Sequence, residues 1–500
     1  MIPLCAALAT ACATTATRPE APQSRGDLLW IARVTYGVDS RALEEVRRRG
    51  RAGYLDTQLS GTDAPLPEVI GRQIEGLHLD ESDAAQIVTT VTAEYRRINA
   101  LPDGADKEQA RRTLGEQGNK LAYAAVRRDL LRAIYSPSQL KEQMVWFWLN
   151  HFSVSQYKAN VRWVIADYEE HAIRPHVFGH FRDLVMATLT HPAMLQYLDN
   201  AQNGVGHVNE NYARELMELH TLGVNAGYSQ QDVQELARIL TGVGLASPSP
   251  PHLKAEWQRL YRRSGGFEFS PARHDFGSKA LLGHHIEGRG FDEVAQAVDL
   301  LVHEPACARF ITRKLATYFV SDDPSPQLLA RLQLTFQRSG GDIGAVLRVL
   351  FASPELDASL GGKFKDPMHY VVSAVRLAYG TRAIVNTHPI VNWLNGLGEP
   401  LYGHPTPDGY SLVESGWAGS GQMVRRFEIA RAIASGNAGL FEPEDGSPAT
   451  TTGFPQLATR LYYEVYEPSL SPTTRVALER ASSQQEWNTF LLASPEFNYR

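Results

Sequence analysis

The segment SPSQLKEQMVWFWLNHF, residues 136–152, decides which fold class we predict for this chain. Ser136, Pro137 and Gln139 follow the order of a helix N-cap, a first-turn proline and a capping-box glutamine. The aromatic run that follows is too apolar for a surface helix. We therefore expect a helix over this segment that lies in the core or lines a cavity.

Helical periodicity extends from Asp27 through the rest of the chain, and alternating strand patterns are scarce. Ser229 and Asp232 predict another helix start, and Gly242 predicts its stop. We therefore predict an all-α fold in which helices pack on helices. The other predicted helices are Leu28–Tyr36, Arg41–Arg48, Arg111–Ile134, Tyr168–His176, Phe181–Thr190, Phe291–Leu301, Pro305–Val320, Ser325–Ser339, Ile343–Ala352 and Met368–Ala378.

Two stretches rich in proline and glycine, residues 246–283 and 396–421, interrupt the helical pattern. Loops of this length in a compact protein are more often functional than idle. By length alone the 500 residues would allow roughly 2 to 4 domain-sized units. The continuous helical pattern instead predicts a single large helical domain over residues 27–500, with two long irregular excursions.

The composition, 43% hydrophobic and 21% charged, is close to that of average soluble proteins. It excludes collagen-like, coiled-coil and wholly disordered chains. The net charge of -6 gives no basic surface for nucleic acid, so we expect no nucleic-acid partner. The cysteines are Cys5, Cys12 and Cys307, and no CxxC pair indicates zinc or redox chemistry.

The N-terminal segment MIPLCAALATACATTAT, residues 1–17, is uncharged and rich in small residues. It is shorter than the roughly 20 apolar residues that span a bilayer, and it resembles an export signal without its basic region. Cys12 after Ala9–Ala11 resembles a loose lipoprotein box, which predicts a lipid anchor at Cys12; an ordinary cleaved signal is the alternative. We predict an export segment and tether over residues 1–26 and an extracytoplasmic location: periplasmic, secreted or lipid-anchored.

The densest polar pattern is NENYARELMELHTLG, residues 209–223. At about 100° per residue, one helix face carries Glu210, Asn211, Arg214, Glu215, Glu218 and Thr221. The spacing of i, i+4 and i+8 lets Arg214 bridge Glu210 and Glu218. The alternative is a solvated face whose salt bridges contribute about 0.3–0.5 kcal/mol each.

Further polar residues lie close to apolar or irregular segments. Asn150 and His151 belong to the aromatic helix, and Asp199 ends the segment HPAMLQYLDN, residues 191–200. Burial and charged neighbours move the pKa values of such groups toward neutrality, as acid–base or metal chemistry requires. Taken singly, His151 and His220 also fit satisfied core histidines, and Asp199 fits a loop hydrogen-bond acceptor. The first excursion adds Arg273, His274, Asp275 and Lys279.

These motifs resemble a large bacterial family, domain of unknown function 1800 (DUF1800). The resemblance rests on residues 146–152, 191–200, 209–224, 227–242 and 273–283, and covers nearly everything after the N-terminal tether. It implies an exported, largely helical bacterial protein and no established activity. The chain departs from the family pattern at Val243, where a tryptophan is usual, and around Trp417, where an asparagine is missing. If those positions line a cleft, specificity differs here.

Three functions remain open at this point. The first is a hydrolase or lyase that acts on a polysaccharide or another envelope or extracellular polymer. The second is a metal- or haem-dependent oxidoreductase with His151, His220 or His274 as ligands, and the third is a non-enzymatic envelope assembly or scaffold protein. The predicted catalytic residues are Glu210, Arg214, Glu215, Glu218, His151, Asp199, His274 and Asp275; the predicted substrate-binding residues are Asn150, Asn209, Asn211, Arg273, Lys279, Tyr410 and Trp417.

Overall fold

The computed structural model describes residues 25–500 except 82, 248, 250, 445 and 448–452. Residues 1–24, with Cys12 and nearly all of the predicted export segment, lie outside this description. The structure is 61% helical with 4% strand, which confirms the predicted all-α class. None of the helices within the described ranges is long and apolar enough to cross a membrane.

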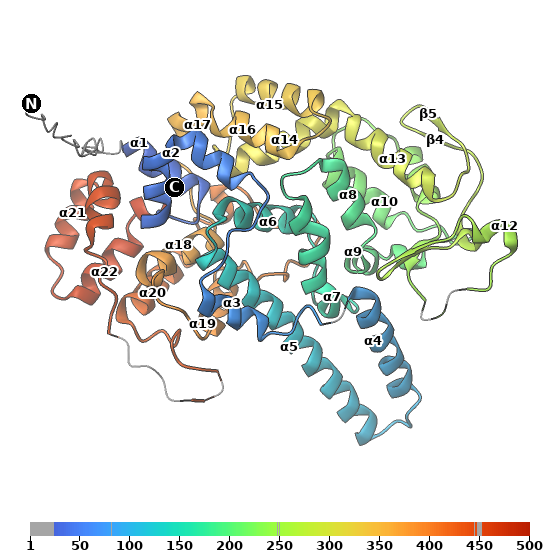
Figure 1. Cartoon of the computed structure of the whole chain (residues 1–500), viewed down its shortest axis with the longest axis horizontal. Helices are drawn as coiled ribbons and strands as arrows, with labels where there is room; N and C mark the ends of the chain where they lie inside the picture. The colour runs from blue at the N-terminus through green and yellow to red at the C-terminus, as the bar shows by residue number, and fades with distance from the viewer. Residues whose placement is uncertain (1–24, 82, 248, 250, 445, 448–452) are drawn as a thin grey trace, which may run out of the picture.

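An arm made of α4 and the outer half of α5 projects from an elongated helical body (Figure 1). The inner half of α5 is buried, whereas the outer half is mostly exposed. The elements are α1 Arg25–Val34, α2 Ser40–Gln58, α3 Glu68–Glu75, α4 Ala84–Asn99, α5 Ala105–Tyr135, α6 Gln139–His151, α7 Val161–Asp167, the π-helix η1 Tyr168–Ile173 and the 3₁₀ turn η2 Arg174–His176.

Helix α6 occupies the core, and every one of its residues is buried, as the aromatic run predicts. The predicted N-cap at Ser136 is wrong, because α6 begins at Gln139 and Ser136 instead ends α5. The Gln139 side chain does not close a capping box. It donates hydrogen bonds to the carbonyls of Ala133 and Ser136 and thereby fixes the corner between the two helices.

The middle of the chain carries the polar motif of residues 209–223 on α10 and a π-helical turn, η4. The wider turn inserts one residue, so the Thr221 hydroxyl donates to the Leu216 carbonyl at 2.6 Å and Thr221 is fully buried. The predicted polar face is therefore wrong at Thr221. The elements are α8 Phe181–Leu189, α9 Pro192–Tyr197, η3 Asn200–Gln202, α10 Asn211–Glu215, η4 Leu216–Thr221 and α11 Gln230–Ile239.

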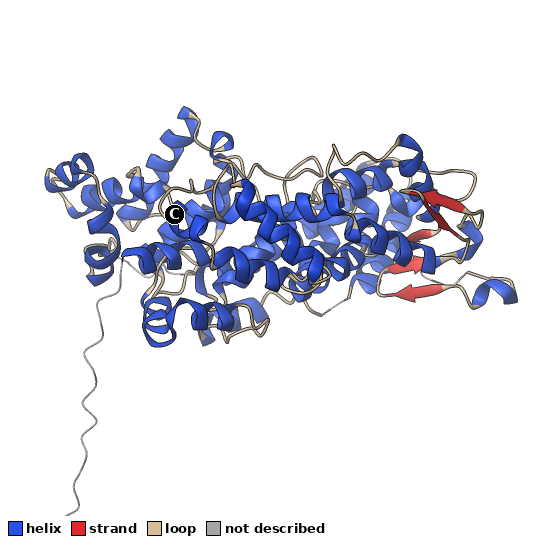
Figure 2. Ribbon diagram, turned by 90° about the horizontal axis from the view of Figure 1, so that it is seen from above, coloured by secondary structure: helices blue, strands red, loops and turns tan. Residues whose placement is uncertain are grey.

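The strands gather at one end of the body (Figure 2) and lie in and beside the first predicted excursion. One antiparallel sheet has the order β1-β3-β2, and a two-stranded hairpin pairs β4 with β5. The described part of the excursion is therefore built largely from small β-elements. Its elements are β1 Val243–Leu245, α12 Ala255–Gln258, β2 Arg262–Ser264, β3 Phe267–Phe269, η5 Pro271–Arg273, β4 Lys279–Leu281 and β5 His284–Ile286.

The C-terminal half returns along the body (Figure 1), and its second irregular stretch contacts Asn150 near the end of α6. Gly409 lies there with a φ of +76°, and an added Cβ would stand 2.1 Å from the Asn150 carbonyl oxygen, so only glycine permits this approach. The elements are α13 Phe291–His303, α14 Pro305–Phe319, α15 Pro326–Arg338, α16 Ile343–Phe351, α17 Pro354–Ser359, α18 Pro367–Tyr379, α19 His388–Gly396, η6 Glu414–Gly416, α20 Ser420–Ser435, η7 Tyr462–Tyr466, η8 Glu467–Ser469, α21 Pro472–Glu479, α22 Gln484–Ala493 and η9 Glu496–Asn498.

Candidate functional site

The last residue of α6, His151, meets the π-turn η4 and helix α14 in the interior. Lys314 of α14 places its Nζ 2.9 Å from His151 Nδ1, and His151 Nε2 lies 3.0 Å from the His220 carbonyl oxygen. Because a carbonyl only accepts, Nε2 carries the imidazole proton, and Nδ1 accepts a hydrogen bond from Lys314. The histidine therefore holds the lysine side chain in one orientation.

Burial lowers the pKa values of the basic side chains His151, Lys314 and His220 and so favours their neutral forms. Burial, followed by the charge of Lys314, holds the pKa of His151 well below its ordinary value. Burial also lowers the pKa of Lys314 to about 8, against an opposing effect of Asp408. His220 is fully buried, its ring nitrogens have no hydrogen-bond partner among the described residues, and burial lowers its pKa to about 3.

The Asp408 carboxylate links Glu215 to this group indirectly, because it acts electrostatically on both Lys314 and Glu215. Glu215 is half-buried, and within the described part of the chain its carboxylate takes part in no hydrogen bond or ion pair. Partial burial raises the pKa of Glu215; Glu218 and Asp408 add to the rise and Arg214 opposes it. We call Lys314, His151, His220, Glu215 and Asp408 the Lys314 cluster.

Arg214 bridges the two carboxylates that the helical spacing predicted. Its guanidinium lies 3.1 Å from Glu210 and 3.6 Å from Glu218, and it also donates to Gln230 at 2.9 Å. About a third of the Arg214 side chain is exposed. This geometry fits a solvated ion network that borders Glu215, which was the alternative interpretation of the motif.

The predicted asparagines form a hydrogen-bonded frame beside the Lys314 cluster. Asn209 Nδ2 donates to the Asp199 carbonyl at 3.2 Å, and Asn211 Nδ2 donates to the Leu198 carbonyl at 3.1 Å. Asp199 has a positive φ of 61° and its carboxylate pairs with Lys158 at 2.7 Å on the surface. These residues fix the backbone that leads into α10.

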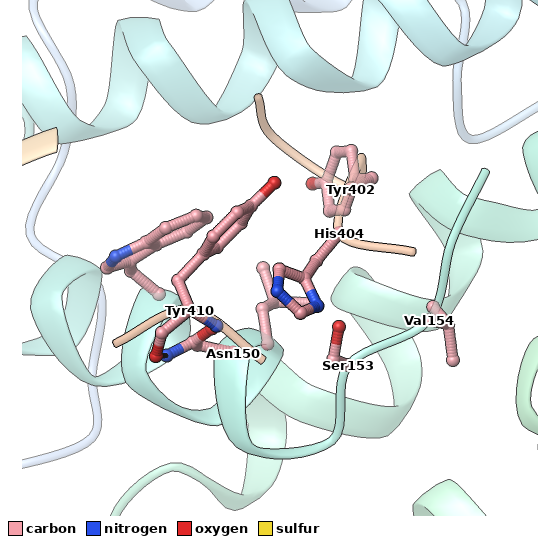
Figure 3. Close-up of a pocket in the computed structure, with 8 residues that line it drawn as sticks. Asn150, Ser153, Val154, Tyr402, His404 and Tyr410 are labelled. Carbon is pink, nitrogen blue, oxygen red and sulfur yellow. Dashed lines mark hydrogen bonds between the residues drawn. The ribbon is translucent and has the colours of Figure 1, made fainter. Parts of the chain in front are cut away.

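Asn150 clamps the second irregular stretch onto α6. Its side chain donates to the Tyr410 carbonyl at 3.0 Å and accepts from the Tyr410 N–H at 2.6 Å. Tyr410 faces a hollow of about 10 Å³, shown with Tyr402 and His404 in Figure 3, which has room for about one water molecule. Trp417 is 6% exposed and donates from Nε1 to the Ser411 carbonyl, so it packs within the loop.

The remaining predicted residues form a second, closed cluster around Glu293 of α13. His274 Nε2 lies 2.9 Å from Glu293 Oε1, and Lys279 Nζ lies 2.5 Å from Glu293 Oε2, with all three side chains fully buried. Burial alone would raise the pKa of Glu293, but hydrogen bonds from His274 and Lys279 outweigh it and lower the pKa. We call Glu293, His274 and Lys279 the Glu293 cluster.

The neighbours of the Glu293 cluster are also satisfied. Asp275 pairs with Arg238 of α11 at 2.8 Å, and the Arg273 guanidinium donates to the carbonyls of Ala201 and Asn203. In these contacts the segment 273–279 joins the β-region to α11, α13 and the loop after α9. Every charged group of this cluster already has its partner.

Almost the whole chain matches a known protein family. The family model described as "Protein of unknown function (DUF1800)" matches residues 29–499 of the 500-residue chain. The chain belongs to the DUF1800 family. No curated protein and no solved structure matches it.

In this DUF1800 protein the predicted site residues do not converge on one pocket. His151 and Glu215 lie in the Lys314 cluster, whereas His274 and Lys279 lie in the Glu293 cluster. The sequence-based interpretation overlooked Lys314, although a usable signal existed. Lys314 follows Cys307 by seven and Ile311 by three residues, so helical spacing places it in line with the buried residues of α14, where a lysine is unusual; Lys314 itself is half-buried.

The histidines proposed as metal ligands do not form a metal site with other side chains. Among the described residues, no three histidine, cysteine, aspartate or glutamate side chains are placed to hold a metal ion. His151 and His274 use both ring nitrogens in contacts with protein atoms. The Lys314 cluster therefore holds a carboxyl with a raised pKa and an amine with a lowered pKa, both under the influence of Asp408.

Proposed function

We propose that the protein is an exported hydrolase or lyase that acts on an envelope or extracellular polymer by acid–base catalysis at the Lys314 cluster. One observation carries the proposal: Glu215 has a raised pKa, Lys314 has a pKa lowered to about 8, and both lie within the field of Asp408. Two groups whose pKa values are shifted toward neutrality from opposite sides are suited to act as acid and base.

In this proposal each side chain has a separate task. Glu215, half-buried and without a hydrogen-bond or ion-pair partner among the described residues, gives its proton to the leaving oxygen of the polymer. Lys314, in its neutral form, takes the proton from water in a hydrolysis or from carbon in an elimination. His151 is a positioning residue, because its Nδ1 holds the lysine amine in place and its Nε2 is fixed by the His220 carbonyl.

The test is degradation of a panel of bacterial envelope and extracellular polysaccharides by purified full-length protein. Hydrolysis creates new reducing ends, and elimination additionally leaves a conjugated double bond that absorbs ultraviolet light. Glu215→Gln and Lys314→Met should each lower kcat about 10²-fold or more, because that is the usual contribution of one acid–base group.

Matched controls are Glu116→Gln and Lys120→Met, which make the same chemical changes at exposed positions of α5. They should leave kcat unchanged. If no polymer in the panel is cleaved, or if Glu215→Gln and Lys314→Met retain full activity while folded, the proposal is wrong.

A scaffold role remains the second candidate, supported by the buried ionic network that joins α5, α6 and η1. Glu169 is fully buried within ion-pair distance of Arg128, Arg132 and Arg174, and Arg174 also pairs with Glu142. Networks of this kind can specify a fold without doing chemistry. This role would be favoured if the wild type cleaves no polymer and if both Glu215→Gln and Lys314→Met have lower melting temperatures than the wild type.

A further inference from the structure

A second place in the molecule combines an enclosed cavity with a nucleophilic side chain, and it shares no residue with the Lys314 cluster. The cavity has a volume of about 50 Å³ and lies between α1, the turns η7 to η9 and α22. Its wall is largely apolar and includes Leu29, Val38, Leu470 and Leu491. For comparison, an apolar cavity of about 150 Å³ holds one benzene molecule, so this one suits a molecule of two or three carbons.

Lys365 reaches the wall of this cavity from the segment that precedes α18. The residue is 6% exposed, and its Nζ donates to Ser373 Oγ at 3.0 Å and lies 3.9 Å from the centre of the Phe497 ring. Phe497 and Gly37 line the cavity, and a Cβ on Gly37 would stand 3.2 Å from Ser373 Cβ. The amine is thus held between two parts of the cavity wall.

The charges that act on Lys365 are those of Arg426 and Arg500, while Glu496 also lines the cavity. No carboxylate among the described residues forms an ion pair with Lys365, Arg426 or Arg500, and Arg500 also lines the cavity. Burial first, and then the charges of Arg426 and Arg500, hold the pKa of Lys365 well below its ordinary value. A lysine that is desolvated and placed beside other cations is the usual form of an amine nucleophile.

Lys363 provides a natural contrast two residues away. It is also buried, at 3% exposed, but its Nζ forms an ion pair with Asp322 and donates to the Leu412 carbonyl at 2.7 Å. The two lysines share the chemistry of their side chains and their degree of burial. They differ in that Asp322 opposes the lowering of the Lys363 pKa by burial, whereas no carboxylate in the described part of the chain forms an ion pair with Lys365.

We propose that Lys365 is a covalent site for a carbonyl compound of two or three carbons, which it binds as an imine inside this cavity. The amine lone pair attacks the carbonyl carbon, a C–N bond forms, and the carbonyl oxygen takes up a proton to give a carbinolamine. The C–O bond then breaks, and the oxygen leaves as water that carries both amine hydrogens. The small volume favours an uncharged aldehyde over a 2-oxo acid, because a 2-oxo acid has nearly as many non-hydrogen atoms as benzene and Glu496 on the cavity wall would repel its carboxylate.

The experiment is reductive trapping in the full-length protein at pH 7. One arm of the experiment uses glyoxylate or pyruvate, and the other uses acetaldehyde or propanal. In each arm cyanoborohydride reduces the imine, and the protein is then digested and its lysine peptides are analysed by mass spectrometry. Lys365 should gain the mass of the reduced adduct at least about tenfold faster than Lys363 or the exposed Lys120, because an ordinary lysine is almost wholly protonated at pH 7. Labelling of Lys365 should saturate with concentration.

The two arms identify the class of the ligand. Labelling of the wild-type protein is sufficient to refute the proposal, without any variant. Preference for glyoxylate or pyruvate assigns a 2-oxo acid, and preference for acetaldehyde or propanal assigns an aldehyde. Lys365→Met should remove the fast label and leave the slow ones. If this variant fails to fold, the ratio of Lys365 to Lys363 label in the wild type decides. Label on exposed lysines with none on Lys365, or label at Lys365 that never saturates, would refute the site.

Discussion

The Lys314 cluster and the Glu293 cluster contain the same three residue types, a lysine, a histidine and a glutamate, yet their environments differ. In the Glu293 cluster the carboxylate touches both basic groups, and all three side chains are fully buried. In the Lys314 cluster the lysine and histidine pair with each other, and Glu215 has no partner among the described residues. The comparison shows that residue identity alone does not separate a closed structural ion cluster from a reactive one.

The largest expected difference comes from removing the carboxylate charge in each cluster. Glu293→Gln leaves the buried Lys279 without its counter-charge and should lower the free energy of unfolding by about 3–5 kcal/mol. Glu215→Gln changes a half-buried carboxyl that has no hydrogen-bond or ion-pair partner in the described part of the chain, so the free energy of unfolding should change by about 1 kcal/mol or less. Urea unfolding of both variants at pH 7 measures the difference. Equal losses would show that Glu215 is structural too.

The two lysines give the next largest contrast. Lys279→Met leaves the Glu293 carboxylate with His274 as its only basic partner and should cost about 2–4 kcal/mol. Lys314→Met should stay within about 1 kcal/mol of the wild type, since the gain from not burying an ammonium offsets the lost donor to His151 Nδ1. Thermal and urea unfolding measure both. A loss of several kcal/mol in Lys314→Met would contradict the assignment of a reactive lysine.

The pH dependence of the free energy of unfolding tests the lowered pKa of Lys314 in the Lys314 cluster. The pKa of Lys314 is about 8 in the folded protein and about 10.4 in an unfolded chain, so below pH 8 the folded state carries the full cost of the buried ammonium. Between pH 8 and pH 10.4 the folded amine is neutral while the unfolded amine is still protonated. The wild type should therefore gain about 1–2 kcal/mol relative to Lys314→Met across this window, after allowance for partial exposure. Parallel stability curves would show that the lysine is not desolvated.

The sequence predicted the elements of both clusters better than their geometry. The aromatic run identified α6 as a core helix, and the i, i+4, i+8 spacing identified the Arg214 bridge. The π-turn η4 inserts one residue without a matching sequence signal, so the position of Thr221 was wrong. Glu293 was overlooked because its carboxylate also accepts the Gly290 N–H, which makes it resemble an ordinary helix-capping glutamate.

Asp408 shows why pairing across distant segments escapes a pattern-based analysis. It lies in a loop of turn-forming residues whose position depends on the Asn150 clamp and on the close approach of Gly409 to α6. Neither contact has a periodic signature, because each joins segments about 260 residues apart. Its electrostatic effects on Lys314 and Glu215 appear only when the loop is placed.

The smallest expected effect belongs to the network that looked most prominent in the sequence. Arg214→Ala breaks ion pairs with Glu210 and Glu218 that are about one third and one quarter exposed, so the free energy of unfolding should fall by only about 0.5–1 kcal/mol, and less at high salt. Arg214 also opposes the rise in the pKa of Glu215, so its removal should move the acidic limb of a kcat–pH profile to higher pH.

Glu210→Gln serves as the matched variant, because it breaks one of the same ion pairs without removing the guanidinium charge beside Glu215. It should show a comparably small loss of stability and leave the acidic limb in place. If Arg214→Ala costs several kcal/mol instead, the motif of residues 209–223 is a structural network like the Glu293 cluster, and the distinction between the two regions no longer holds. If stability barely changes while the pH profile moves, Arg214 acts on the ionisation of Glu215, which a purely structural salt bridge would not do.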